Sequence, residues 1–340
     1  MSPQPSAAVV TTIDDTWRAW IAENLIFGSP PNTLAQILIR HGVPQAMAIA
    51  EVDAAARSPY LRGADRLKRR LAKHDWALDV QRKLNCLRPS TVEHCHRISA
   101  EDFLARHYRT NWPVIITGML DAWPAMQRWN FDYFREHYGE REVEVQFGRN
   151  ADANHELNSI AHKKRMRFGD YVDLVRASDA SNDFYMTANN DSTNRQALAG
   201  LWNDIVPLPE YLDPAKPGGF FWFGPKGTIT PSHHDLTNNL MAQVIGSKRL
   251  LLIPTGELPN LYNFRHCFTP VDGRHIDLAQ FPDMARVQML ECVIEPGDLL
   301  FLPVGWWHFV EGLAASVTMT FTNFCWDNDF YSNYPAEHYF

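Results

Sequence analysis

The sequence is poor in cysteine, and its cysteines form no motif. The 340 residues contain five cysteines, an odd number, and no two of them make a CxxC pair. They are Cys86, Cys95, Cys267, Cys292 and Cys325. A disulfide framework or a structural zinc site would require even numbers or close spacing. This pattern excludes both and favours a reducing compartment, so we expect a cytoplasmic protein.

Long hydrophobic runs are absent too. No stretch approaches the roughly 18 consecutive apolar residues of a spanning helix, so we expect no membrane association. The opening residues MSPQPSAAVVTTIDD lack the basic region and apolar core of a signal peptide.

Excess positive charge is missing as well. The formal net charge is −7, whereas proteins that bind nucleic-acid phosphates usually carry a basic surface. Two short basic runs, 66–70 and 162–167, are most simply solvated surface. Nucleic acid is therefore not an expected partner.

The chain divides into two regions of different character. Residues 13–86 predict four helices: one capped by Asp14 or Asp15, one from Pro31 that stops at Gly42, one from Pro44, and one over 61–84. Beyond residue 88, aromatic and β-branched residues become frequent. We predict a helical N-terminal unit over 1–88 and a second domain over 89–340.

The second region predicts a mainly β fold with flanking helices. Short apolar runs alternate with turns at 113–117, 142–147, 249–253, 298–302 and 316–322. Many short strands of this kind are typical of an antiparallel barrel or jelly roll, that is, a double-stranded β-helix.

The most informative segment is 227–248. On a strand, side chains alternate between faces, so His233 and Asp235 point the same way and His234 points the opposite way. Turns at 296–297 and 303–305 would deliver a third residue, His308, from a distant strand. Taken singly, an HxD triplet arises by chance and a histidine beside tryptophans is usually core. Together they match the two-histidine, one-carboxylate ligand set of non-haem iron oxygenases.

Further residues are expected in the same cavity. If Gly246-Ser247 formed a two-residue hairpin turn, Lys248 would pair with Ile245 and face inward. An inward lysine is costly unless it meets an anion. Asn239 would share that inner face by period-2 alternation. Asn323 would hydrogen-bond near the metal from the strand face of Met319 and Phe321.

These residues resemble the motifs of the cupin superfamily, and within it the JmjC-type oxygenases. The first motif consists of Gly227, His233-x-Asp235, Asn239 and Gly246, with Asp for the second His and Asn for the usual Glu. The second consists of Gly297, Pro303-x-Gly305 and His308, with Gly312 for the final Asn. The similarity is strongest to the branch of the asparaginyl hydroxylase that acts on hypoxia-inducible factor.

The resemblance implies a set of cofactors and residues that hold them. They are Fe(II), 2-oxoglutarate as cosubstrate, and O2. Iron would be held by His233, Asp235 and His308. The 2-oxoglutarate tail would be bound by Lys248, Thr230 and Tyr185, and the site lined by Asn239 and Asn323.

The implied function is hydroxylation of a side chain of a peptide or protein, with release of succinate and CO2. One alternative is the same chemistry on a small-molecule metabolite, a methylated lysine or a tRNA base. Against demethylation, Asp235 stands where histone demethylases commonly have Glu. Another alternative is a non-oxygenase metal cupin or a binding module.

The N-terminal helices are expected to bury their apolar residues against the barrel or a second subunit. These residues are Trp17, Leu25, Ile37 and Leu38. A homodimer is therefore one of the assemblies to be considered.

Overall fold

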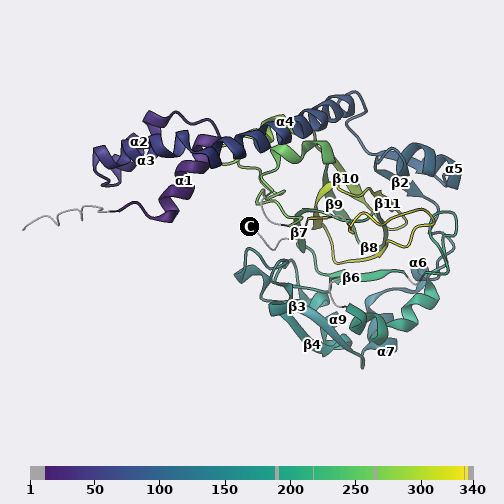
Figure 1. Ribbon diagram of the computed structural model, residues 1–340. Helices are drawn as coiled ribbons and strands as arrows, with labels where there is room; N and C mark the ends of the chain where they lie inside the picture. Colours follow the sequence, from purple (N-terminus) through teal and green to yellow (C-terminus); the bar gives the residue numbers. More distant parts are fainter. Residues whose placement is uncertain (1–11, 188–190, 217, 264–265, 333, 336–340) are drawn as a thin grey trace, which may run out of the picture. The chain divides into compact units, whose positions relative to one another are not determined.

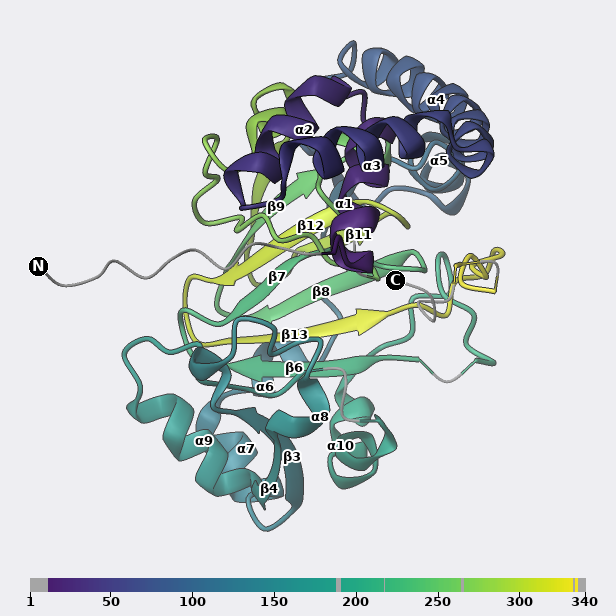
Figure 2. The same cartoon turned by 60° about the vertical axis from the view of Figure 1, so that its left-hand side comes forward.

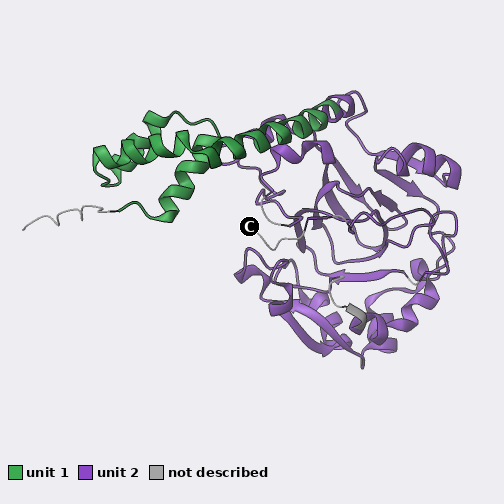
Figure 3. Ribbon diagram, in the orientation of Figure 1, with its two compact units in different colours: residues 1–80 green, residues 81–340 purple. Residues whose placement is uncertain are grey.

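The computed structural model describes residues 12–187, 191–216, 218–263, 266–332 and 334–335 (Figure 1). The opening residues 1–11, for which no signal peptide is predicted, lie outside the described residues. The chain forms two compact units, residues 1–80 and 81–340 (Figure 3). No described helix is both long and apolar enough to cross a membrane.

The N-terminal helices begin and end close to where the sequence predicts. Asp14 caps the first of them, since its carboxylate accepts a hydrogen bond from the Trp17 amide at 2.9 Å. Gly42 follows the second helix with a φ of +87°, a conformation that favours glycine. The four helices are α1 (Asp15–Ile26), α2 (Pro31–Arg40), α3 (Gln45–Arg57) and α4 (Pro59–Asn85).

The N-terminal unit has a core of its own. Ile21, Leu34, Leu38 and Val52 are fully buried in one cluster that α1, α2 and α3 share, and Trp17 and Leu25 pack against it. The expectation that these helices need the barrel or a second subunit to bury Leu38 was therefore wrong. Three short helices connected by tight turns are close enough to bury one another's apolar faces.

The second unit is a jelly roll of two facing sheets. Eight consecutive strands make up the jelly roll, with β6, β8, β11 and β13 in one sheet and β7, β9, β10 and β12 in the other. Figure 2 shows β8, β13 and β6 side by side. The larger sheet has the order β1-β2-β11-β8-β13-β6 and the smaller β10-β9-β12-β7. The bounds are β6 (Phe220–Gly224), β7 (Ile229–His234), β8 (Asn239–Ile245), β9 (Lys248–Ile253), β10 (Leu290–Ile294), β11 (Leu299–Leu302), β12 (Trp307–Gly312) and β13 (Ser316–Phe321).

The turn at Gly246-Ser247 does not form the predicted hairpin. β8 pairs with β11 and β13, whereas β9 pairs with β10 and β12, so the turn carries the chain from one sheet to the other. Lys248 pairs with Ile294 and Gly312 rather than with Ile245. Because both sheets turn one face toward the interior, Lys248 still points inward.

Two apolar layers enclose the larger sheet. Between the sheets lie Met241 and Leu300 from one side and Leu250 and Val310 from the other. On the outer face, Met319 and neighbouring residues of β8, β11 and β13 pack against α7 (Phe131–Tyr138) and α9 (Phe168–Ala177). Strand alternation thus assigns each residue to the interior or to the helical layer.

A small third sheet, of order β4-β3-β5, carries the second basic run. Its lysines and arginines face acidic residues: Lys163 pairs with Glu144 at 3.1 Å and Arg165 with Glu142 at 3.2 Å. The run is therefore largely neutralised, which agrees with its interpretation as ordinary surface. The strands are β3 (Glu142–Phe147), β4 (Lys163–Arg167) and β5 (Phe184–Tyr185).

The remaining elements are short and flank the sheets. They are β1 (Glu93–His96), α5 (Ala100–Phe103), η1 (Leu104–Tyr108), β2 (Val114–Thr117), α6 (Ala125–Arg128), η2 (Arg149–Ala151), α8 (Ser159–His162), α10 (Asp191–Ala197), η3 (Ala199–Asp204), η4 (Thr255–Asn260) and η5 (Pro282–Arg286).

The sheet-crossing turn offers a test of the fold. Gly246 has a φ of +66°, and a Cβ there would overlap the carbonyl oxygen of Ala315. Gly297 has a φ of +100° with open space around it, so it serves as the matched control. We expect Gly297→Ala to cost about 1–2 kcal/mol from backbone strain, and Gly246→Ala roughly 3 kcal/mol or more because the overlap adds to the strain.

Urea unfolding of both variants measures the difference. If strain alone mattered, Gly297→Ala would be the more destabilised of the two, because its φ lies farther from the left-handed helical minimum. That order would contradict close packing at the turn.

Candidate metal centre

Three side chains with metal-ligating atoms converge between β7 and β12. His233 lies on β7, Asp235 just beyond its end, and His308 on β12, where it is the direct cross-strand partner of His233. The ring centroids of the two histidines are 4.1 Å apart, and His233 Nε2 lies 3.7 Å from Asp235 Oδ1. One ligand atom from each of the three residues lies within 4.8 Å of the others. The structure thus brings the predicted set together.

Backbone carbonyls orient both imidazoles. His233 Nδ1 lies 2.8 Å from the Pro231 carbonyl oxygen, and His308 Nδ1 lies 3.0 Å from that of Trp306. A carbonyl oxygen can only accept, so each Nδ1 carries the proton and donates. Each Nε2 therefore presents a lone pair, which is the arrangement that metal-ligating histidines use.

His308 is held in its neutral form. It is buried, and burial together with the neighbouring His233 lowers the pKa of its imidazole. A neutral imidazole is the form that binds a metal. His308 is therefore already in the required protonation state near neutral pH.

Asp235 is also held at two points, one on its side chain and one on its backbone. Asn239 Nδ2 donates to Asp235 Oδ2 at 3.2 Å, and the Gly305 amide donates to the Asp235 carbonyl oxygen at 3.2 Å. The second contact connects the end of β7 to the turn before His308. Among the described residues, Asn239 Oδ1 is buried and has no hydrogen-bond partner. Such an atom calls for a ligand or a water.

An ammonium group lies at the other end of the same space. Lys248 is 2% exposed, and its Nζ donates to Tyr185 Oη at 3.1 Å. No carboxylate of the described residues pairs with it, and burial lowers the pKa of Lys248 to about 7. A buried amine with spare donors fits an anionic ligand.

The two ends belong to one cavity of about 60 Å³ between the sheets. Since a water needs on the order of 10–15 Å³ by this measure, several waters or a small organic anion would fit. The cavity is lined by Tyr185, Trp222, Thr230, His233, Asp235, Asn239, Met241, Lys248, Leu302, His308, Val310 and Thr320.

Thr230 reaches this cavity because of an irregularity in β7. Thr230 and His233 are three residues apart, so strict alternation would put them on opposite faces. The pairing with β12 shifts between His308 and Val310, whose partners are His233 and Thr230. A bulge of this kind re-aims side chains next to functional sites. Both residues consequently line one cavity.

Thr320 is among the lining residues that were not identified from the sequence. Thr320 accepts a hydrogen bond from Trp222 Nε1 at 2.9 Å, and together they form one wall. The alternation of Thr318 and Thr320 with Met319 in β13 was the available signal. Which of the two faces lay inside could not be read from it.

Asn323 does not lie in the cavity, contrary to prediction. Its Nδ2 donates to the carbonyl oxygens of Asp213 and Lys216, at 3.0 and 3.1 Å. Met319 and Phe321, whose strand face it was predicted to share, pack on the outer, helical side of the sheet. The prediction grouped Asn323 with Met319 and Phe321, but it assigned their side of the sheet to the cavity instead of to the outer, helical layer.

His234 points away from the metal centre, as predicted. Its ring meets that of Trp307 edge-on at 4.7 Å, and Tyr334 is close by at 5.7 Å. Burial lowers the pKa of His234. It therefore serves as an internal comparison for the two candidate ligands.

A larger cavity lies beside β7. It has a volume of about 650 Å³, and Pro231, Ser232 and Phe268 contribute to its lining. The Phe268 ring also stacks against His233 with centroids 5.6 Å apart. Charged residues of both signs, including Arg149 and Asp272, border this space.

Comparisons with known proteins agree with this geometry. A family model described as a cupin-like domain matches residues 100–332. Lysine-specific demethylase JMJ30 of Arabidopsis thaliana is 32% identical over 262 residues, which cover 73% of this chain and 57% of that protein. Lysine-specific demethylase 8 of Xenopus tropicalis is 28% identical over 242 residues, 68% of this chain and 52% of that protein.

A shorter human relative covers more of its own length. The bifunctional peptidase and (3S)-lysyl hydroxylase JMJD7 of Homo sapiens is 26% identical over 251 residues, 63% of this chain and 79% of that protein. The chain spans little more than half the length of the two demethylases. The names of these three relatives do not single out the asparaginyl hydroxylase branch.

The convergence of the three ligand atoms leads to a test by metal binding. We expect His308→Ala to lower Fe(II) affinity at least roughly 100-fold, since loss of a supporting residue alone typically costs 10–100-fold. His234→Ala, which removes the neighbouring imidazole of the opposite face, should keep the affinity within a few-fold. Anaerobic titration with Fe(II) measures both. Equal affinities in the two variants would remove His308 from the site.

Proposed function

The chain belongs to the cupin-like domain family, and from that premise we propose that it is an Fe(II)- and 2-oxoglutarate-dependent oxygenase that modifies a protein side chain. The observation that carries this proposal is the pairing of two features in one small cavity. The His233, Asp235 and His308 ligand set is at one end, and the buried Lys248 ammonium is at the other.

The donor set fits iron and a dicarboxylate cosubstrate. Two neutral imidazoles and one carboxylate are the ligands of non-haem iron oxygenases. The Lys248 ammonium has no carboxylate partner among the described residues, and Asn239 Oδ1 lacks a hydrogen bond. A ligand with a charged tail and polar atoms near the metal would satisfy both groups.

The residues of the chain then have distinct tasks. When bound, iron and 2-oxoglutarate supply oxygen activation, in which decarboxylation to succinate and CO2 is coupled to hydroxylation of a substrate C–H bond. Lys248 holds the distal carboxylate, with Tyr185 beside it. Asn239 keeps Asp235 in position. The apolar walls formed by Leu302 and Val310 exclude water.

The substrate of this proposal is a protein or peptide. A cavity of about 60 Å³ has no room for a peptide beside the cosubstrate, so the target must approach from outside it. The cavity of about 650 Å³ that shares Phe268 with the metal centre is the space we assign to part of that target. Its charged lining suits polar peptide groups better than an apolar metabolite.

Two reactions on a protein remain to be separated. JMJD7 of Homo sapiens is named a lysyl hydroxylase, which favours hydroxylation as the final outcome. The two relatives named lysine-specific demethylases favour a second candidate, in which a hydroxylated N-methyl group leaves as formaldehyde. Asparaginyl hydroxylation is a finer variant of the first reaction.

Product analysis distinguishes these outcomes. The full-length protein would be incubated with Fe(II), 2-oxoglutarate and a peptide library that contains lysine, methyl-lysine, arginine and asparagine. We expect a mass gain of one oxygen atom that depends on 2-oxoglutarate and is absent with Asp235→Ala. Loss of a methyl group instead would favour the second candidate. No succinate above the Asp235→Ala background, with or without peptide, would overturn the oxygenase proposal.

The lysine makes cosubstrate binding dependent on pH. Because the pKa of Lys248 in the free protein is about 7, the ammonium is present below pH 7 and binding needs no proton. Above pH 7 a proton must be taken up when the carboxylate binds, so the Kd for 2-oxoglutarate should rise about tenfold per pH unit. Calorimetric titration at pH 6.5 and 8.5 with Mn(II) in place of iron measures this.

Variants of two lysines complete that experiment. Lys248→Met keeps the side-chain length and removes the charge, so 2-oxoglutarate should bind about tenfold or more weakly at pH 6.5 and with little pH dependence. Lys226→Met, at an exposed position on the turn before β7, should behave as the wild type. If the wild type bound 2-oxoglutarate equally well at both pH values, Lys248 would not hold the carboxylate.

A further inference from the structure

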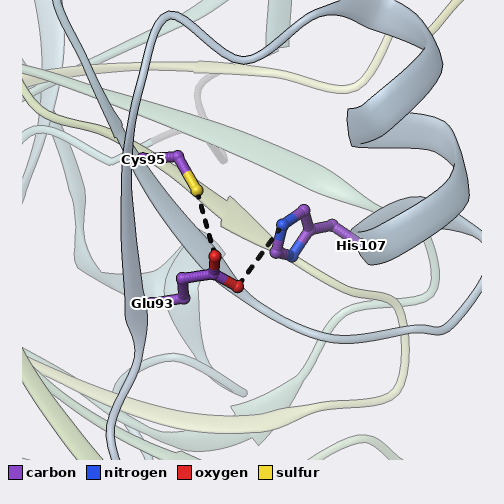
Figure 4. Close-up of side chains that lie close together, drawn as sticks. All are labelled: Glu93, Cys95 and His107. Atoms are coloured by element: carbon purple, nitrogen blue, oxygen red, sulfur yellow. Dashed lines mark hydrogen bonds and ion pairs between the residues drawn. The ribbon is translucent and has the colours of Figure 1, made fainter.

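A second group of metal-ligating side chains lies at the edge of the larger sheet, on elements that the iron site does not use. Glu93 and Cys95 are two residues apart on β1, so both point to the same face of this edge strand. His107 approaches them from the helical turn η1 (Figure 4). One ligand atom from each of the three lies within 4.8 Å of the others.

The imidazole of His107 is the unusual member of this group. It is 1% exposed, and among the described residues neither ring nitrogen has a hydrogen-bond partner. Its Nε2 lies 3.9 Å from Glu93 Oε2, which is beyond hydrogen-bond distance. Buried polar atoms in native proteins nearly always have partners. An imidazole aimed at a carboxylate and a thiol therefore indicates a missing ligand between them.

The Glu93 carboxylate is divided between two environments. Its Oε1 accepts from Cys95 Sγ at 3.4 Å and from the Arg106 guanidinium. Its Oε2 faces His107. Arg106 can thus keep Oε1 while Oε2 serves another partner, and carboxylates that bind metals are commonly supported in this way. Without a further ligand, these contacts satisfy Glu93 and Cys95 but not His107.

The helical turn that carries His107 is itself exceptional. Residues Leu104–Tyr108 form a π-helical turn, and the Arg109 amide donates to the Leu104 carbonyl oxygen at 3.0 Å. π-helical turns are rare and frequently found at functional sites, because the extra residue turns a side chain out of the α-helical register. In this turn, the side chain that is directed toward β1 is that of His107.

We propose that Glu93, Cys95 and His107 form a second metal site, which binds a divalent transition metal of the zinc class. Thiolate, imidazole and carboxylate are the mixed ligands that Zn²⁺ accepts, and three protein ligands leave the fourth position to water. On binding, the Cys95 thiol releases its proton to solvent, a sulfur–metal bond forms, and no electron is transferred.

The geometry requires only a modest closure. Metal–ligand bonds of about 2.0–2.3 Å imply separations of roughly 3.3–3.8 Å between tetrahedral ligand atoms. The observed limit is 4.8 Å. The Glu93 side chain is 45% exposed, so solvent rather than packed protein borders much of it. Burial lowers the pKa of His107, which keeps the imidazole neutral as a ligand must be.

This proposal differs from one expectation from the sequence. The scattered cysteines argue against a structural zinc site, but that reasoning applies to sites built from paired cysteines. The proposed site uses a single cysteine, Cys95. Its two partners come from the same strand and from a helical turn. The sequence spacing of such a mixed set follows no recognised motif.

Cobalt(II) spectroscopy on the full-length protein tests the site directly. A thiolate bound to cobalt gives a charge-transfer band in the near ultraviolet, which the iron ligands His233, Asp235 and His308 cannot produce. We expect the band in the wild type and its loss in Cys95→Ser. Cys86→Ser, which changes an exposed cysteine, is the matched control and should retain the band.

Two further variants separate the outcomes. His308→Ala should retain the band, so a failed oxygenase proposal would leave this site intact. Glu93→Gln changes an accessible residue with little risk to folding and should weaken zinc binding about 10–100-fold in equilibrium dialysis. Circular dichroism verifies that each variant is folded. The absence of a band at saturating cobalt in the wild type, or a band that persists in Cys95→Ser, would overturn the proposal.

Discussion

The antiparallel pairing of β7 with β12 is the constraint on which the candidate metal centre depends. It puts His308 directly opposite His233, so two imidazoles that are far apart in the sequence lie with their ring centroids 4.1 Å apart. The same pairing contains the irregularity that brings Thr230 onto the face of His233. Backbone carbonyls two residues before each histidine then fix which nitrogen carries the proton. Strand pairing thus sets the position and face of the two imidazoles, and local backbone carbonyls set which nitrogen is protonated.

The Lys248 end of the cavity follows from the way in which the two sheets face each other. Lys248 begins β9 in the smaller sheet, and Tyr185 reaches it from β5 of the third sheet. Enclosure by these layers removes the lysine from water and lowers its pKa to about 7. A buried amine is unfavourable in isolation. The carboxylate of the proposed cosubstrate would offset this cost.

Much of the chain could be predicted because the relevant physics is local. Asp14 caps α1 through a hydrogen bond that spans three residues, and the alternation of His233 and His234 follows from strand geometry alone. The errors have one common origin. The supposed hairpin at Gly246, the inward Asn323 and the dependent N-terminal helices each required knowledge of which distant element lies opposite. Local sequence patterns predict which residues of a strand share a face, but not which face is turned toward the space between the sheets.

The sequence by itself determined the types of candidate metal ligand, which of them share a strand face and the elements that carry them, because these depend on spacings of a few residues. Only the tertiary structure decided which side chains meet. Tyr185 with Lys248, Trp222 with Thr320, and His107 with Glu93 and Cys95 come together from separate elements. The physical reason is that such contacts result from the burial and pairing of whole strands and helices, where the energy is shared among many residues. No short stretch of sequence contains that information.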